Sequence, residues 1–140
     1  MSGTDWKAVV RAADGYRTRE PAQRSALDQA EVALQVVLPD TLRDLYLATD
    51  GVFDEPGQWF VIWPIVELVT RNADAYAVEG NRRRALVGFG DDGTGSPFCV
   101  RSDGSDEVAS WSAIDQQATH LADDLVSFWI GWVGGTLPPH

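Results

Sequence analysis

Residues 86–100 have the sequence LVGFGDDGTGSPFCV, two apolar runs separated by a loop of Gly, Asp, Thr and Ser. The apolar runs have the composition of β-strands, and the glycines and aspartates between them favour a tight turn. The stretch predicts a β-hairpin whose acidic, glycine-rich tip carries Asp91 and Asp92. Helical patterns come before it, and a further strand and a last helix follow it. We therefore expect the sheet to be built around this hairpin.

Apolar residues recur at helical spacing in four segments before the hairpin and in one segment after it. The predicted helices span residues 6–13, 27–34, 42–49, 64–79 and 123–134. Thr4 is predicted to cap the first helix, and Ser25 to open a capping box for the second. Pro39 stops the second helix and stands near the start of the third.

The segments between these helices are predicted to be strands and connectors. Aromatic and β-branched residues predict strands at residues 58–63 and 107–111. Connectors are predicted at residues 16–22, 53–57 and 112–120 from their polar or turn-forming composition. The basic triplet Arg82–Arg84 is predicted to be a solvated turn. Because no linker interrupts the 140 residues, we expect one domain over the whole chain.

The charge of the chain is strongly negative. It has 21 acidic and 11 basic residues, a formal net charge of −10. Residues 86–140 carry eight of the acids and a single base, Arg101. Nucleic-acid binding needs a basic surface, so nucleic acid is not expected as a partner. A charged partner is expected to be basic.

Two features bear on the compartment. Cys99 is the only cysteine and lies in an apolar run, which favours a buried structural thiol and a reducing environment. The chain begins with no basic segment followed by an apolar one, and its apolar runs are too short or too interrupted to span a bilayer. We therefore expect a soluble cytoplasmic protein that does not bind membranes.

The hairpin tip carries patterns that resemble nucleotide and metal sites. Gly88 to Gly93 has the spacing of the dinucleotide-binding fingerprint, but Pro97 and an apolar run follow where a helix should begin. A P-loop is excluded because no lysine follows Lys7. The adjacent aspartates do not have the spacing of a calcium loop, although weak binding of a divalent ion at the tip remains open.

Hydrolytic or metal chemistry is not indicated by the rest of the chain. His120 and His140 are the only histidines, and neither lies in a triad context or at metal-ligand spacing from another His or Cys. Acids in glycine-rich turns are usually solvated, which does not favour acid–base catalysis. We expect no catalytic residue, no metal, no cofactor and no enzymatic activity, and an enzyme is kept only as a third hypothesis.

The chain has six tryptophans, most of which are expected in the core by their spacing. Trp59 and Trp63 lie near the acidic turn of Asp54 and Glu55, where an exposed indole would suit a protein interface.

Three segments, taken in order, resemble the SUKH superfamily of domains related to a yeast cell-wall-synthesis regulator. The first comprises AEVAL at 30–34, VLPDTLRDLY at 37–46 and the closing TDG at 49–51. Residues 89–99 resemble the mid-domain turn of the family, and residues 125–129 resemble its C-terminal aromatic helix. The resemblance spans about residues 25–133. Asp50 stands where the family often has Asn.

The resemblance implies a single α+β domain: a twisted, mostly antiparallel sheet flanked by N-terminal helices, a mid-chain helix and a C-terminal helix. It also implies a non-catalytic bacterial immunity protein that binds and neutralises a protein toxin, often a nuclease. With the net charge, it leads us to expect an acidic contact surface. The candidate partner-binding residues are Asp54, Glu55, Trp59, Trp63, Asp91, Asp92, Asp103 and Asp106. The alternative is a regulatory adaptor that binds a cellular protein or peptide through a Trp-lined groove.

Overall fold

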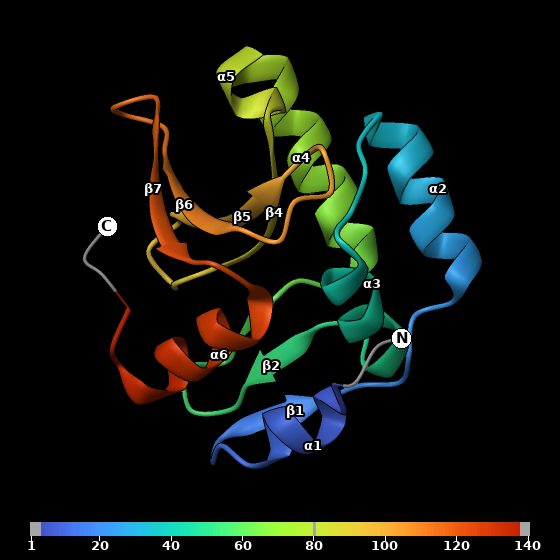
Figure 1. Ribbon diagram of the computed structural model, residues 1–140, viewed down its shortest axis with the longest axis vertical. Coiled ribbons are helices and arrows are strands. Elements are labelled where there is room, and N and C mark those ends of the chain that lie inside the picture. The colour runs from blue at the N-terminus through green and yellow to red at the C-terminus, as the bar shows by residue number, and fades with distance from the viewer. Residues whose placement is uncertain (1–3, 80, 138–140) are drawn as a thin grey trace.

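A computed structural model describes residues 4–79 and 81–137 of the chain. They form a single α+β domain with an open sheet of seven antiparallel strands and helices around it (Figure 1). The elements in chain order are α1 (Trp6–Arg11), β1 (Tyr16–Thr18), α2 (Arg24–Leu34), α3 (Asp40–Ala48), β2 (Val52–Asp54), β3 (Trp59–Ile62), α4 (Ile65–Glu79), α5 (Asn81–Arg84), β4 (Leu86–Asp91), β5 (Pro97–Arg101), β6 (Val108–Ser112), β7 (Gln117–Ala122) and α6 (Leu125–Gly134). The fold class predicted from the sequence is confirmed.

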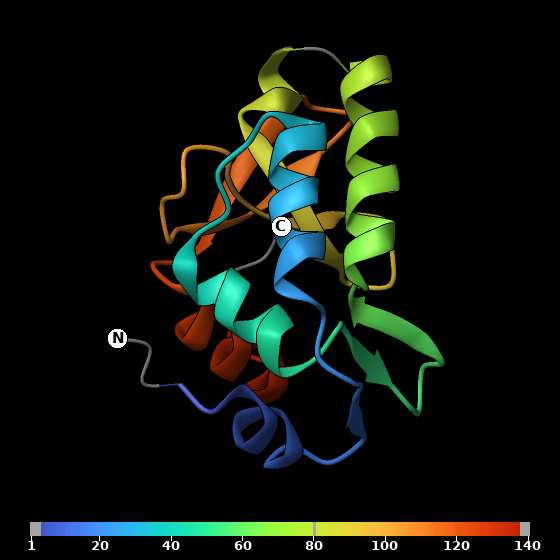
Figure 2. The same cartoon turned by 90° about the vertical axis from the view of Figure 1, so that its right-hand side faces the viewer.

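The sheet is a meander in which strands pair in chain order from β1 to β7. Two helical insertions interrupt it: α2 and α3 separate β1 from β2, and α4 and α5 separate β3 from β4. The insertions lie against each other, with α2 and α4 side by side (Figure 2). No described helix is both long and apolar enough to cross a membrane.

The predicted hairpin is present as β4 and β5, joined by the acidic tip. Asp91 pairs with Pro97 at the end of the ladder, and the register shifts between Gly88 and Gly90. Each tip aspartate folds back on the loop: Asp91 Oδ1 accepts from the Gly93 N–H at 2.8 Å, and Asp92 Oδ1 accepts from the Thr94 N–H at 2.9 Å. The acids therefore stabilise the turn itself.

The strand β4 meets β3 at a narrow junction. Ile62 and Gly90 are the one register pair between these strands, supported by a backbone hydrogen bond from Trp63 N to Phe89 O at 2.8 Å. A Cβ atom on Gly90 would overlap the carbonyl oxygen of Val61. Glycine is therefore required here by the close approach of two backbones.

The inner face of the sheet packs against α6 through aromatic side chains. Phe89 and Phe98 lie with their ring centroids 5.7 and 4.7 Å from that of Phe128, both in edge-to-face geometry. All three side chains have no exposed surface. Burial of such rings supplies much of the hydrophobic stabilisation of a domain of this size.

The outer face of the sheet carries Leu86, Gly88, Cys99 and Trp111 and is held by α4. Leu86, Cys99 and Trp111 form a small hydrophobic cluster separate from the main core. Burial raises the pKa of the Cys99 thiol to about 11, so the group is a protonated packing element, as its apolar surroundings in the sequence suggested.

Several predicted boundaries were wrong. Connectors were predicted over most of three segments that are strands, Tyr16–Thr18, Val52–Asp54 and Gln117–Ala122. These strands are short or mostly exposed, so they carry no alternating pattern. Asp5, not Thr4, caps α1 by accepting from the Ala8 N–H. The helix α2 has Gln23 at its N-cap with no side-chain hydrogen bond, so the predicted capping box at Ser25 is absent.

The basic triplet was also misjudged, because it forms the short helix α5 rather than a solvated turn. Arg83 is only 2% exposed, while Arg82 and Arg84 remain at the surface. Arg83 alone of the three arginines is buried because its position on α5 turns its side chain toward α4 and β4.

Candidate functional site

The outer face of the sheet is only partly covered, and a groove lies where α4 meets the loops at the strand ends. One cavity of about 490 Å³ is lined by Trp63, Arg71, Glu79, Asp91 and Trp111, among others. A second cavity of about 580 Å³ is lined by Trp59 and shares Trp63, Arg71 and Asp91 with the first. Because they share walls, we treat the two cavities as one depression and call it the tryptophan groove. Its volume is in the range that suits a ligand or a partner side chain.

Trp63 forms the centre of the groove. Its Nε1 donates to Asp91 Oδ2 at 3.2 Å, and the guanidinium carbon of Arg71 lies 4.7 Å from the ring centroid. Arg71 is held by an ion pair with Glu67, one helical turn earlier on α4, at 3.1 Å. Trp63 is 4% exposed as a result, so Arg71 acts as its cover.

Trp59 borders the groove beside the hairpin tip. Its Nε1 lies 3.5 Å from the Asp91 carbonyl oxygen, a long contact at the limit of a hydrogen bond. Trp59 pairs with Asp54 across the β2–β3 hairpin, which brings that carboxylate to the same end of the groove. Asp54 Oδ1 accepts from the Gly57 N–H at 3.0 Å and closes the turn.

Trp111 lines the opposite end of the groove. Its Nε1 donates to Glu79 Oε1 at 2.8 Å, which ties β6 to the last turn of α4. The ring is 4% exposed, whereas Ile114 at the rim is 94% exposed. The groove therefore has two buried indoles, Trp63 and Trp111, and an apolar residue that projects into solvent beside it.

A buried polar network supports the floor of the groove. The Asn72 side chain donates to Gly88 O and accepts from the Gly88 N–H, both at 2.8 Å. Arg83 donates to Asn72 Oδ1 and to Leu86 O, both at 2.8 Å. The Tyr76 hydroxyl also donates to Leu86 O, at 2.6 Å, and burial is the main cause that raises its pKa. The network fixes β4 against α4 and α5.

Arg83 is a buried cation that forms no ion pair with any residue in the described ranges 4–79 and 81–137. Its Nε has no hydrogen-bond partner there either. The Tyr76 ring lies 5.4 Å from the guanidinium carbon and offers its π-face instead. The Arg83 side chain also approaches Gly88, where a Cβ would lie 3.0 Å from Arg83 Nη2.

The structure places three of the eight predicted site residues in the groove, three in or next to the adjoining turns, and the other two in a separate loop. Trp59, Trp63 and Asp91 line the groove. Asp54 and Glu55 lie at the β2–β3 turn, and Asp92 lies in the β4–β5 turn. Glu55 is paired with Arg17 at 2.7 Å.

Asp103 and Asp106 lie in the β5–β6 loop, at the other end of β5. At about 3.3 Å per residue, the four steps along β5 separate the two ends by about 13 Å. Asp103 bridges Val37, and the Thr41 hydroxyl donates to Asp106 Oδ1 at 3.4 Å, so this loop meets the α2–α3 connection. The predicted acids therefore do not form one continuous patch.

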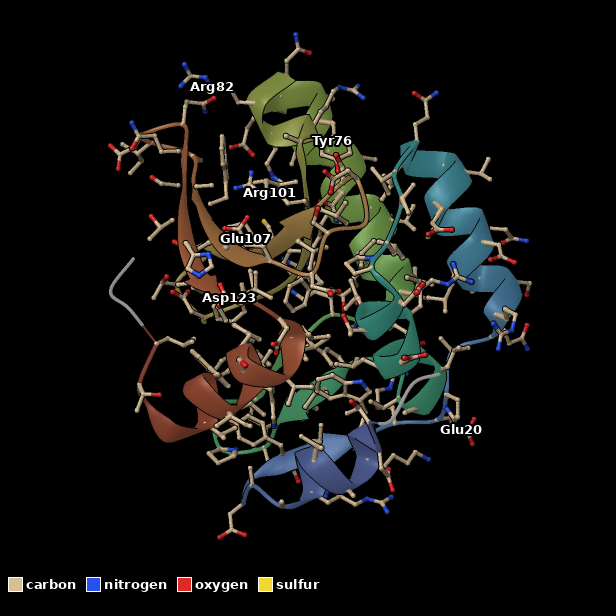
Figure 3. The ribbon with its side chains drawn as sticks, in the orientation of Figure 1. Glu20, Tyr76, Arg82, Arg101, Glu107 and Asp123 are labelled. Atoms are coloured by element: carbon tan, nitrogen blue, oxygen red, sulfur yellow. The ribbon has the colours of Figure 1, made fainter. Side chains whose placement is uncertain are left out.

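A second charged cluster lies away from the groove and comprises Arg101 on β5, Glu107 just before β6, His120 on β7 and Asp123 just after β7. Figure 3 shows Arg101, Glu107 and Asp123 in a column, with Glu107 between the other two. His120 lies 2.7 Å from Glu107 and 3.2 Å from Asp123, and Arg101 pairs with Glu107 at 3.0 Å. The hydrogen bond with His120 is the first cause that lowers the pKa of Glu107. Within the described residues, no three His, Cys, Asp or Glu side chains are placed to hold a metal ion.

Sequence reasoning missed the α4 wall of the groove and Trp111. Arg71, Asp74 and Glu79 read as the solvent-facing side of an amphipathic helix, which is the usual meaning of such residues. Only the packing of α4 beside β4 and the β6–β7 turn makes them one wall of a cavity. The spacing of Trp63, Arg71 and Asp91 along the chain does not predict that they line the same cavity.

Comparison with known families identifies the chain. It belongs to the SMI1/KNR4 family (SUKH-1), whose family model matches residues 21–130. Members are known generally as immunity proteins of polymorphic toxin systems and are typically non-catalytic. A search of curated proteins gives no match to this chain. The family predicted from residues 25–133 is confirmed.

Proposed function

We propose that this protein is an immunity protein that binds a cognate toxin, with the tryptophan groove and its neighbouring acids as the contact surface. The observation that carries the proposal is the groove itself, which presents the half-buried Trp59 indole beside Asp91 in a chain of net charge −10. Tryptophan is the residue type most enriched among energetically dominant interface positions. Family membership supplies the toxin as the class of partner.

The acids around the groove favour a basic toxin surface, for example the active site of a nuclease. Opposite charges steer association and raise its rate at low salt. Binding would neutralise the toxin by occupying that surface, and the immunity protein would contribute no catalytic group. We place this event in the cytoplasm, where the free thiol of Cys99 stays reduced.

The test uses a candidate cognate toxin, sought as a C-terminal toxin domain in a gene next to this one. Binding is measured by stopped-flow association, and neutralisation by rescue of growth on co-expression. The variant Glu55→Lys/Asp92→Lys changes charge beside the groove, and Asp103→Lys/Asp106→Lys makes the same change at the far end of β5. The groove-side pair is expected to lower the association rate at least about tenfold at low salt, and the control pair to lower it less. Equal reductions of the association rate by the two double variants, or an association rate that does not change with salt concentration, would contradict the proposed surface.

The same groove supports a second candidate, a regulatory adaptor that holds a cellular protein or peptide by aromatic contacts. Trp59, the half-buried indole at the tip, separates the two functions. Trp59→Ala would abolish adaptor binding while the charge variants leave it unchanged, whereas an immunity protein would respond to both.

A further inference from the structure

The two edges of the sheet differ in how they are protected. The strand β1 has only three residues, and α1 lies against it (Figure 1). The strand β7 is the other edge and has six residues. Within the described parts of the chain, the β7 backbone forms hydrogen bonds only with β6, so its outer row of N–H and C=O groups has no protein partner there. The β7 edge is therefore an open template for a further strand.

The strand β7 also lacks the residues that usually guard an edge. Natural edge strands often carry lysine or proline as obstacles to pairing. The sequence QATHLA of β7 contains neither, and its only ionisable side chain, His120, turns back to Glu107 at 2.7 Å and to Asp123 at 3.2 Å. Residues 117–120 are exposed, and the register against β6 shifts only beyond His120. The first four residues of β7 are therefore accessible and regularly paired on one side alone.

Acids stand at both ends of this edge. Asp115 lies in the turn before β7, and Asp123 lies directly after the strand. Among the described residues, Asp115 has no cationic partner, and Asp123, whose side chain is 94% exposed, has only His120. The edge therefore presents open backbone groups between two carboxylates that the protein neutralises little.

This charge pattern distinguishes a second copy of the chain from another partner. Antiparallel pairing of β7 with β7 of a second copy would bring Asp115 of each chain close to Asp123 of the other. Like charges across a strand pair are destabilising, and each copy carries a net charge of −10. A segment with arginine or lysine at both ends would instead place opposite charges at the same two positions. The pattern therefore favours a basic strand over a second copy.

We propose that the β7 edge pairs with an extended basic segment of the bound partner, which adds a strand to the sheet by main-chain hydrogen bonds. At about 3.3 Å per residue, the six residues of β7 offer about 20 Å of edge. The turn that leads into β7 also lines the tryptophan groove through Ala113 and Ile114, so the edge continues the proposed contact surface. The inference deepens the proposed function and rests on it for the identity of the partner as a toxin.

The test titrates the ¹⁵N-labelled full-length protein at low salt with the peptide acetyl-Arg-Thr-Val-Thr-Val-Arg-amide. Saturable shifts are expected in the backbone amide signals of residues 117–122, and amide hydrogen exchange in β7 is expected to slow at saturation. Neither change is expected in β1. Two control peptides are expected to give no saturable shift. One has glutamate in place of both arginines, and the other has N-methyl groups on its four central residues, which keep the charge and remove the donors.

Two double variants test the acids at the ends of the edge. Asp115→Asn/Asp123→Asn is expected to weaken binding of the arginine peptide at least about threefold at low salt. Asp14→Asn/Glu20→Gln makes the matched change at the acids on either side of β1, the covered edge, and is expected to change the affinity less than about 1.5-fold.

Several outcomes would overturn the proposal. They are the absence of a saturable shift in β7, equal binding of either control peptide, equal losses in the two double variants, and a dimer that pairs β7 with β7 when no peptide is present.

The titration needs no toxin, so the two levels of the proposal fail separately. Toxin neutralised by a protein whose β7 does not bind the arginine peptide would refute the edge pairing alone. Pairing of the arginine peptide with β7 without neutralisation of any toxin would refute the immunity function and leave the edge pairing standing.

Discussion

Replacement of Asn72 by alanine is expected to destabilise the fold by about 3–5 kcal/mol. The Asn72 side chain is completely buried and takes part in four hydrogen bonds, with Leu68 O, Gly88 O, the Gly88 N–H and Arg83. Alanine leaves the last three of these groups without a partner at a site closed to water. Each such group costs about 1–3 kcal/mol, and partial relaxation brings their sum to the expected range. This is a large share of the stability of about 5–15 kcal/mol that is typical of a domain.

Urea unfolding followed by circular dichroism measures the loss. Asn81→Ala, the same change at an exposed site on α5, is the control and is expected to stay within about 0.5 kcal/mol of the wild type. Arg83→Met should destabilise less in the Asn72→Ala background than alone, because the cation has already lost its partner there. A loss below about 1 kcal/mol for Asn72→Ala, or strictly additive effects of the two substitutions, would refute the reasoning.

Three further predictions concern a glycine, a carboxylate and the thiol. Gly90→Ala is expected to lower the free energy of unfolding by at least about 2 kcal/mol, measured by thermal unfolding, because the added Cβ meets the Val61 carbonyl oxygen. The control Gly134→Ala meets no close atom and should cost under about 0.5 kcal/mol. Equal costs of the two substitutions would contradict the close approach of β3 and β4 at Gly90. The lowered pKa of Glu107 means that its contribution to stability is present above the usual pKa of 4.5 and is lost as pH falls through the lowered pKa. Glu107→Gln should therefore reduce stability at neutral pH and flatten the loss of stability as pH falls below 4.5, and an unchanged pH slope would contradict this. Burial and a pKa of about 11 predict that a thiol reagent labels Cys99 only on unfolding, so labelling rates should follow urea concentration, and fast labelling of the native protein would contradict it.

The parts of the fold that sequence reasoning located are those with a strong local signal. The β4–β5 hairpin combines two apolar runs with a turn that only glycine and aspartate suit, and both features are local. The long helix α4 and the aromatic helix α6 likewise show their periodicity within one segment. Such elements can be predicted because neighbours in the chain decide them.

The strands that were missed are decided by neighbours in space. Val52–Asp54 has three residues, too few for an alternating pattern, and is a strand because β1 and β3 pair with it on both sides. Gln117–Ala122 is an edge strand with four exposed residues, so its composition looks like that of a loop. Pairing partners far along the chain supply the hydrogen bonds that define both.

The candidate site divides in the same way. Trp59 and Trp63 were singled out because indoles near the acidic turn of Asp54 and Glu55 suggest an interface, and Asp91 because of its charge. The structure brings the three together, with a hydrogen bond of 3.2 Å from Trp63 to Asp91 and a longer contact of 3.5 Å from Trp59 to the Asp91 carbonyl oxygen. The buried Arg83 could not be told from Arg82 and Arg84 by composition, since the helical turn of α5 alone decides which of the three points inward. The acids of α4 line the groove only because of how this helix packs on the sheet. The sequence predicts the helix but not which of its side chains face the groove.

The junction between β3 and β4 has one register pair, against the fuller ladders on either side, so we expect the sheet to open there first. Subglobal opening should therefore release the strands β1 to β3 before the strands β4 to β7. The hydrogen bond from Trp63 to Asp91 crosses this boundary, as does the groove above it. A partner seated in the groove contacts both sides of this junction, because the lining includes Trp59 of β3 and Asp91 of β4. Amide hydrogen exchange should then slow on binding even in β1, which contributes no residue to the lining.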